Sequence, residues 1–270
     1  TQIALDRANG LDVILMEEPE NHLSFSTLRK MLQQISDQQE NSQIIVATHN
    51  NMIASRLNLN NVLWITKDGV KSLKGVKSDA AEFFVRADDN AFLQLLLSKK
   101  VILVEGATEF LLLPMFYKQI TDHTIEEDGV SVISCNGISY KRYLEIAKAT
   151  DKRIAVVTDN DEKSDRIAEA ASFNQANVLQ HIFMPRDFPI FLPSYFCVRK
   201  ACIYKENKDT LDEMIDVQAG AAYKFHDKDY GAVLGKMLNH KVDVAYQMLT
   251  SGKTFAVPQY IKAAIEWLRE

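Results

Sequence analysis

The sequence predicts an α/β fold, because short apolar runs of strand length alternate with segments of helical spacing along most of its 270 residues. The runs Leu11–Met16 and Ile44–Ala47 flank a helical pattern over Phe25–Ser36. A second series of runs lies at 101–104, 130–134 and 154–158, with helical patterns between them. Apolar runs without polar alternation are typical of buried parallel strands. Both series therefore predict strand–helix–strand units.

Three further elements complete the predicted organisation. They are a hairpin over 62–73 with an Asp-Gly turn, a helical connection over 78–98, and a mostly helical region beyond Arg166. The change from one strand–helix series to the next predicts a domain boundary near residues 75 to 98. We therefore expect an N-terminal α/β part over 1–75, a linker helix over 76–98, and an α/β domain with a helical C-terminal elaboration over 99–270.

The composition predicts a globular protein of the cytoplasm. Apolar residues make up 47% of the chain, which is enough for substantial cores. The most apolar stretch, Phe92–Phe116, is interrupted by charges before it reaches the roughly 20 residues of a membrane helix. Three cysteines are too few and too irregularly spaced for a disulfide framework or a zinc site. The start at Thr1 does not resemble a signal peptide, and we expect it to lie inside a longer chain.

The formal net charge of −5 argues against a protein that coats nucleic acid nonspecifically. An enzyme that gathers carboxylates around metal ions can nevertheless be acidic overall and carry a local basic track. Composition therefore leaves nucleic acid open as a partner.

Acidic and polar side chains follow the first two predicted parallel strands. Glu17 and Glu18 end the first strand, where one carboxylate can hold Mg²⁺ and the next can orient water for attack on a nucleotide γ-phosphate. His49 follows the second strand at the same predicted edge. Taken singly, the acids could cap a helix and His49 could be an ordinary strand-end histidine. No phosphate-binding Gly-x-x-x-x-Gly-Lys-[Ser/Thr] loop occurs in the 270 residues, so we expect no ATP hydrolysis by this chain alone.

A second set of carboxylates follows the later strands. Glu105 ends the run 101–104, and Glu109 comes one helical turn later on the same face. Asp159 and Asp161 follow the run 154–158. If these strands are neighbours, four carboxylates meet, and bound Mg²⁺ or Mn²⁺ would offset their mutual repulsion. Two such ions can activate water and stabilise the leaving oxygen in phosphodiester hydrolysis. Each acid alone could instead be a solvated loop residue or a turn or helix cap.

These motifs resemble those of the OLD (overcoming lysogenization defect) family, in which an ABC-type ATPase is joined to a Toprim domain. Val13–Glu18 looks like a Walker B strand, Glu20–Leu23 like a D-loop region and Thr48–Asn50 like a switch-histidine segment. The Toprim pattern is represented by Glu105-Gly106, Asn136-Gly137 and Asp159-x-Asp161. The resemblance implies the C-terminal portion of an ABC ATPase followed by a Toprim domain, which is a parallel sheet with flanking helices.

The resemblance also implies a role for residues nearer the C-terminus. Asp212 or Glu213 matches a segment that adds a ligand for the second metal ion. Lys241, in a predicted helix over Gly235–Leu249, matches a lysine that stabilises the phosphate transition state. Without the resemblance, Lys241 is equally well explained as an exposed helical lysine.

As a whole, the resemblance implies a DNA endonuclease that uses two Mg²⁺ or Mn²⁺ ions. The resemblance further implies that the nuclease acts in phage defence and is regulated by its ATPase part. That part would form a homo-oligomer and would bind ATP only together with an N-terminal ATPase portion that these residues lack. Two alternatives stay open. One is another Toprim reaction, of the topoisomerase or primase kind, although no nucleophilic tyrosine domain is evident beside the motifs. The other is a noncatalytic assembly module whose acids bind a structural metal ion or none.

Overall fold

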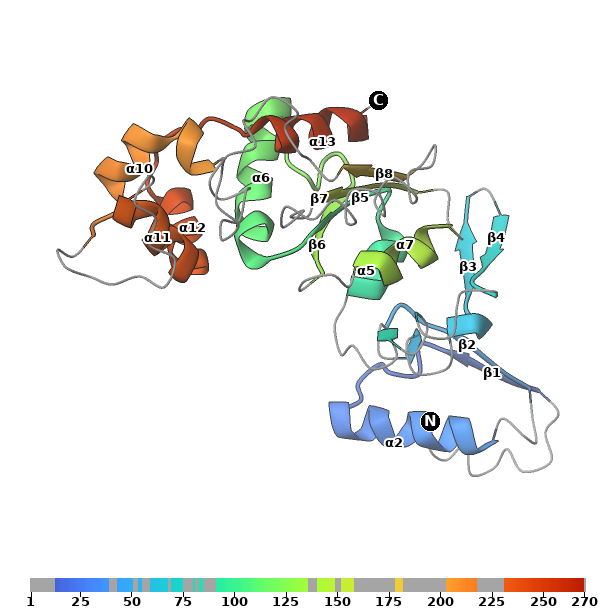
Figure 1. Ribbon diagram of the computed structural model, residues 1–270. Helices are drawn as coiled ribbons and strands as arrows, with labels where there is room; N and C mark the ends of the chain where they lie inside the picture. Colours follow the sequence, from blue (N-terminus) through green and yellow to red (C-terminus); the bar gives the residue numbers. More distant parts are fainter. Residues whose placement is uncertain are drawn as a thin grey trace. The chain divides into compact units, whose positions relative to one another are not determined.

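The computed structural model of the chain forms two compact units (Figure 1). The first comprises Thr1–Leu97 with Lys148–Thr150, and the second comprises Ser98–Ala147 with Asp151–Glu270. The structure describes residues 13–38, 43–50, 53–54, 59–67, 69–74, 80, 83–84, 91–135, 140–148, 152–157, 178–181, 203–217 and 231–269. Within these ranges, none of the helices has both the length and the apolar character needed to cross a membrane.

The first unit contains the predicted strand–helix–strand arrangement. Strand β1 (Val13–Glu17) pairs in parallel with β2 (Gln43–Ala47), and helix α2 (Phe25–Gln38) connects them. One face of α2 is buried because its apolar residues recur at helical spacing. The buried cluster consists of Leu28, Met31, Leu32, Ile35 and Ile53, against which Met16, Leu23, Ile44 and Val46 pack.

Two smaller elements follow in the first unit. After the 3₁₀ helix η1 (Leu59–Asn61), strands β3 (Leu63–Thr66) and β4 (Gly69–Ser72) form the predicted antiparallel hairpin. Gly69 has a φ of +122°, a conformation that side-chain-bearing residues rarely adopt, which explains a glycine at this turn. Helix α5 (Ala91–Leu97) lies within the segment predicted to be a helical connection.

The second unit is built on a four-stranded parallel sheet with the order β6-β5-β7-β8. Its strands are β5 (Lys100–Val104), β6 (Val130–Ser134), β7 (Arg153–Val157) and β8 (Val178–His181). Residues 101–104 of β5 are completely buried, as expected for a central parallel strand that is covered on both faces. Helix α6 (Ala107–Thr121) joins β5 to β6, and α7 (Tyr140–Lys148) follows β6. The α/β fold class is therefore confirmed.

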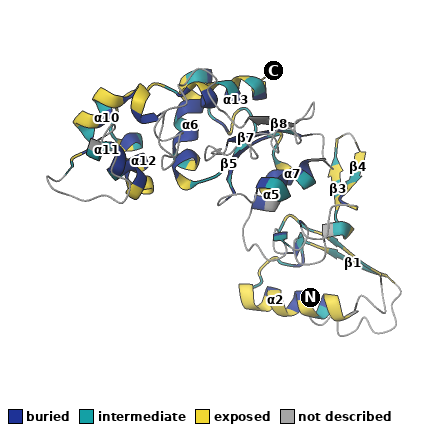
Figure 2. Ribbon diagram, viewed as in Figure 1, coloured by how far each residue is buried: buried dark blue, intermediate teal, exposed yellow. Residues whose placement is uncertain are grey.

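The C-terminal region is helical, and much of it packs on α6 (Figures 1 and 2). Its helices are α10 (Lys208–Met214), α11 (Gly231–Asn239), α12 (Lys241–Thr250) and α13 (Gln259–Arg269). Helices α12 and α13 contact α6, and α13 also contacts β7. Apolar side chains from all these elements form one continuous core, which includes Phe116, Met248 and Ile265.

The structure corrects two predictions for this region. The prediction of a mostly helical chain beyond Arg166 overlooked the edge strand β8, whose four residues are too few to give a periodic signal. The single helix predicted over Gly235–Leu249 is interrupted at His240, whose backbone is not helical (φ −119°, ψ 54°). Lys241 is therefore the first residue of α12 and not a residue of a helix interior.

The strand order also locates the crevice of the sheet. The chain leaving β5 goes to β6 on one side, whereas the chain leaving β7 goes to β8 on the other. In open parallel sheets, ligands bind beyond the carboxyl ends of the strands where the connections diverge in this way. The topology therefore favours the carboxyl ends of β5 and β7 as the candidate site.

Candidate functional site

Strand β5 delivers the first predicted acid to this crevice. Val104 pairs with Val157 of β7 on one side and with Ser134 of β6 on the other, so the three strands end level with one another. The amide of Cys135 donates to the carbonyl of Val104 at 2.8 Å, which extends this pairing to the end of β5. Glu105 comes next in the chain and is partly exposed. It therefore stands at the switch point of the sheet.

Glu109 follows four residues after Glu105, where the chain passes from β5 into α6. Residues 105–109 are called the acidic turn below. Glu109 is only 2% exposed and occupies the first turn of α6, three residues after the N-cap residue Gly106. A methyl group at Gly106 would come within 3.3 Å of Glu109 Oε2, so the carboxylate is folded back over the turn and needs the space that glycine leaves. The unpaired amides and the dipole at a helix N-terminus favour a negative charge here. Glu105 and Glu109 therefore both stand at the carboxyl end of β5, Glu105 directly after the strand and Glu109 in the first turn of α6.

The other half of the predicted carboxylate cluster lies outside the described residues. Asp159 and Asp161 follow β7, and Asn136 and Gly137 follow β6, but none of these four is described. Within the ranges that are described, no three His, Cys, Asp or Glu side chains lie close enough together to hold a metal ion. The four-carboxylate site therefore stays a prediction. Of its four acids, the structure describes Glu105 and Glu109.

Lys241 is brought to the acidic turn from the far end of the chain. The hydroxyl of Thr108, which is 6% exposed, donates to the backbone carbonyl of Lys241 at 3.4 Å. Thr108 immediately precedes Glu109, so the first turn of α12 lies against the first turn of α6. The side chain of Lys241 is exposed. Sequence reasoning singled out Lys241 but missed Thr108, because nothing in the local sequence reveals a partner 133 residues away.

Asp212 and Glu213 of α10 are occupied by other contacts. Asp212 accepts hydrogen bonds from Lys208 at 2.5 Å and from the hydroxyl of Tyr204 at 2.7 Å. Burial alone would raise the pKa of Asp212, but these two donors outweigh it and lower the pKa. Glu213 pairs with Lys253 at 2.5 Å, which lowers the pKa of Glu213. Both acids therefore have lysine partners, Lys208 at the start of α10 and Lys253 beyond α12, and their role as metal ligands is still a prediction.

The first unit brings together two of its three predicted site residues. Glu18 follows β1 and has a left-handed backbone (φ 39°), and its Oε1 lies 2.9 Å from Nδ1 of His49, which follows β2. The side-chain amide of Asn21 donates to Glu18 Oε2 at 2.9 Å. The hydrogen bonds from Asn21 and His49 lower the pKa of Glu18. Glu17, the last residue of β1, is exposed.

A second contact joins the same two loops. The hydroxyl of Thr48 donates to Glu20 and also accepts from the amide of Asn50 at 2.9 Å. Together with the Glu18–His49 pair, this contact ties the loop after β1 to the loop after β2. Polar contacts therefore connect the loops at the carboxyl end of the first sheet.

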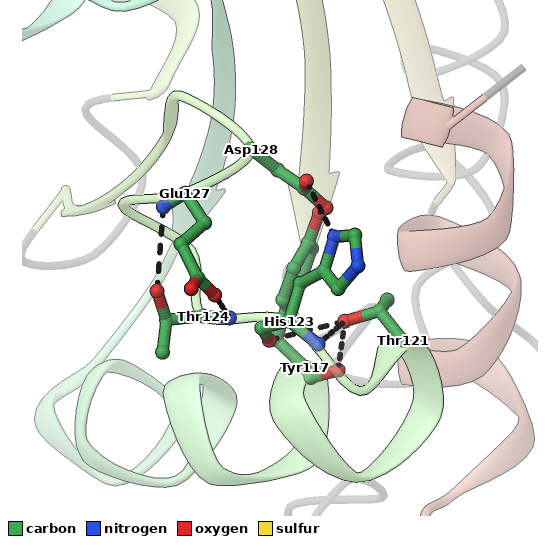
Figure 3. Close-up of polar contacts among 6 residues, drawn as sticks. All are labelled: Tyr117, Thr121, His123, Thr124, Glu127 and Asp128. Carbon is green, nitrogen blue, oxygen red and sulfur yellow. Dashed lines mark hydrogen bonds and ion pairs between the residues drawn. The ribbon is translucent and has the colours of Figure 1, made fainter.

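A third polar cluster lies at the opposite end of the second sheet, between α6 and β6 (Figure 3). Asp128 accepts from the hydroxyl of Tyr117 at 2.6 Å and contacts Nδ1 of His123 at 2.9 Å. These partners lower the pKa of Asp128, and Asp128 in turn raises the pKa of His123. The cluster lies before the start of β6, whereas the acidic turn follows the end of β5. Because these strands are parallel, the cluster and the acidic turn lie at opposite ends of the strands. We interpret the cluster as a clamp that closes the α6–β6 loop.

Comparison with known proteins identifies the class of protein first. Residues 96–161 match the model of the OLD-like Toprim domain (overcoming lysogenization defect protein-like). Residues 3–55 match an AAA domain whose description refers to the AbiEii toxin of a type IV toxin–antitoxin system. In these two segments the chain is therefore similar to an ATPase-type domain and to a Toprim domain.

Individual proteins are similar to parts of this chain. The Old nuclease of Escherichia phage P2 is 26% identical over 161 residues, which are 55% of this chain and 28% of that protein. The C-terminal region of the Burkholderia pseudomallei OLD protein aligns over 64% of this chain and 97% of its own (17% identity, TM-score 0.43). The C-terminal region of the Xanthomonas campestris pv. campestris OLD protein aligns over 65% and 94% (18% identity, TM-score 0.40). The sequence matches confirm the predicted resemblance to the OLD family.

The clamp in Figure 3 predicts a pH-dependent stability of the second unit. The raised pKa of His123 means that its contribution is complete below its unfolded pKa of about 6.5 and is lost as the pH rises through the folded value. The lowered pKa of Asp128 means that its contribution is present above about pH 3.8 and is lost as the pH falls below it. Glu127 adds to the effect on His123, and Arg269 of α13 opposes it.

We therefore expect His123→Ala to lower the free energy of unfolding at pH 5.5 and to have a much smaller effect at pH 8.5, as measured by urea denaturation. Asp128→Asn should remove the same pH dependence while leaving the imidazole in place. If His123→Ala lowers the stability equally at both values, the pair contributes no pH dependence and His123 is only a packing residue.

Proposed function

We propose that this chain is a metal-dependent DNA endonuclease module that hydrolyses phosphodiester bonds. The observation that carries the proposal is the convergence of Glu105, Glu109 and the first turn of α12, which bears Lys241, at the switch point of a Toprim sheet. The kinship with a phage nuclease supports the same reaction class. DNA is therefore the proposed substrate, and defence against phage is the proposed setting.

The residues at the acidic turn fit a divalent metal ion. Their donors are carboxylate oxygens, which Mg²⁺ and Mn²⁺ prefer. The Glu109 carboxylate is buried against the Gly106 backbone, so it is already oriented and largely desolvated. We propose that Glu105 and Glu109 hold metal together with Asp159 and Asp161, and that Asp212 or Glu213 adds a further ligand. Two bound ions would lower the pKa of the attacking water and stabilise the leaving oxygen.

The protein itself supplies position and charge. In-line attack on a phosphodiester places additional negative charge on the phosphate oxygens, which a nearby ammonium group can stabilise. Lys241 has the right charge, and its exposed side chain starts from a backbone that touches the acidic turn. The Glu109 carboxylate is held in the first turn of α6, so the turn itself needs little rearrangement as the reaction proceeds.

For the first unit we propose a regulatory or assembling role. Glu18 and His49 are paired, as would suit a carboxylate that orients water and a histidine that contacts a γ-phosphate. No phosphate-binding loop occurs in the 270 residues, so ATP would bind only with a further N-terminal portion. We propose that such a complete ATPase part forms a homo-oligomer that controls cleavage.

The carboxylates can be tested by amide substitution, which keeps the shape and removes the charge. We expect Glu105→Gln, Glu109→Gln and Asp159→Asn each to reduce plasmid cleavage with Mn²⁺ or Mg²⁺ to the level seen with EDTA. Calorimetry should show weaker Mn²⁺ binding, and circular dichroism should show an unchanged fold. Glu266→Gln, on the exposed surface of α13, is the matched control and should cut normally. Wild-type rates in all three variants would exclude the metal assignment.

Lys241 should act on the chemical step and not on binding. We expect Lys241→Ala to slow single-turnover cleavage by roughly a hundredfold or more, comparable with the loss of a preorganised donor in other enzymes, while DNA affinity changes little. Lys262→Ala, which removes an exposed charge from α13, serves as the control. Similar small effects of the two substitutions would return Lys241 to the ordinary solvated surface.

Glu18, which pairs with His49 in the first unit, should have no catalytic role in this chain. We expect Glu18→Gln to leave metal-dependent cleavage nearly unchanged and the purified chain to release no phosphate from ATP, because the phosphates have no cradle. The measurement is phosphate release alongside plasmid cleavage. ATP turnover by the 270-residue chain that is abolished by Glu18→Gln would overturn this expectation.

A further inference from the structure

We infer that Thr108 is a positioning residue that holds the first turn of α12, and with it Lys241, against the acidic turn. The inference rests on the proposed function, because it concerns how the lysine reaches the phosphate that the acids and metal ions bind. It also goes beyond that function, because Thr108 is neither one of the predicted metal-binding acids nor the predicted lysine.

The first observation is the place of Thr108 in α6. It lies between Gly106, which supplies no side-chain cap, and Glu109, whose carboxylate covers the turn. Its side chain is 6% exposed, and its hydroxyl donates to a carbonyl of another helix, the backbone of Lys241. A buried hydroxyl is costly unless it is hydrogen-bonded. The contact with α12 therefore accounts for a threonine at a position where an apolar residue would pack as well.

The second observation is how α12 is held elsewhere. Its buried residues, Val244, Ala245 and Met248, join the core that α6 contributes to. All of them come after the first three residues of the helix, and residues 240–243 are exposed. The N-cap residue His240 forms no side-chain cap. The start of α12 is also tied to α11, because the amide of His240 donates to the carbonyl of Lys236 at 2.8 Å. Packing therefore anchors the body of α12, and the hydrogen bond from Thr108 joins its first turn to α6.

This geometry matters because lysine has a long flexible stem. An ammonium group on four methylenes reaches the same point only if its backbone starts from a fixed place. Displacement of a reacting group by about 1 Å can lower a rate about a hundredfold. At 3.4 Å the Thr108 hydrogen bond is long, so a smaller effect is expected from its loss.

The test is a double-mutant cycle between Thr108 and Lys241 in single-turnover cleavage with Mn²⁺. Thr108→Val keeps the shape and removes the hydroxyl, and we expect it to slow cleavage about three- to tenfold. Thr108→Ser keeps a hydroxyl and should restore most of the rate. In a Lys241→Ala background, Thr108→Val should have no further effect, because the group that it positions is already absent. DNA affinity, measured by fluorescence anisotropy without Mn²⁺, should not change.

Thr121→Val is the matched control. Thr121 is also a buried threonine of α6, but its hydroxyl donates to Tyr117 of the same helix at the opposite end. Any general loss of stability from removing a buried hydroxyl should appear in both variants as a lower melting temperature. The dependence on Lys241 should appear only for Thr108.

Each outcome decides a separate question. The inference is wrong if the wild-type chain cuts DNA and the Thr108→Val variant cuts equally fast. It is also wrong if Thr108→Val slows cleavage in the Lys241→Ala background as much as in the wild type, because Thr108 then does not act through Lys241. If the wild-type chain does not cut DNA with Mn²⁺ or Mg²⁺, the proposed function itself fails and the inference fails with it.

Discussion

The parallel pairing of β5 with both of its neighbours is the constraint on which the candidate site depends. Because Val104 is level with Val157 and with Ser134, residues that follow three separate strands start from one edge. This pairing requires β5 to be buried on both faces, which its uninterrupted apolar sequence allows. Polar chemistry is then restricted to the strand ends. The strand order makes the end of β5 the place where the connections diverge and a crevice forms.

Burial of Glu109 at that edge sets the electrostatics of the acidic turn. A buried carboxylate is costly unless positive charge or hydrogen-bond donors offset it. The first turn of α6 supplies such a field, and the α12 turn that bears Lys241 lies against it. Glu109 is thus confined beside Gly106, whereas Asp212 and Glu213 are held by lysine partners. Glu109 and the two acids of α10 therefore differ in their surroundings, although the sequence alone makes all three candidate metal ligands.

Local patterns predicted the strands, α6 and the acidic turn, because apolar runs and strand-end acids are properties of a few adjacent residues. Four features could not be read in that way. Strand β8 is too short to have a period, and the break at His240 depends on a single non-helical backbone. The Thr108 contact joins residues 133 positions apart, so it exists only once the chain has folded. The Lys253 partner of Glu213, 40 residues away, is a fourth such feature, whereas the i,i+4 spacing of Lys208 and Asp212 can be read from the sequence.

The two units place acidic side chains in the same way but surround them differently. In each, acids follow a parallel strand and so come to lie at the carboxyl end of the sheet, although β5 is buried whereas β1 has exposed residues such as Leu15. In the first unit the acid is already paired, because Glu18 meets His49 and Asn21 across the loops, an arrangement that suits orienting a water molecule beside a nucleotide. In the second unit Glu105 follows the strand directly, and Glu109 is buried in the first turn of the next helix. The same strand-end position therefore has different surroundings in the two units: Glu18 is paired and only partly exposed in the first, and Glu109 is buried in the first turn of α6 in the second.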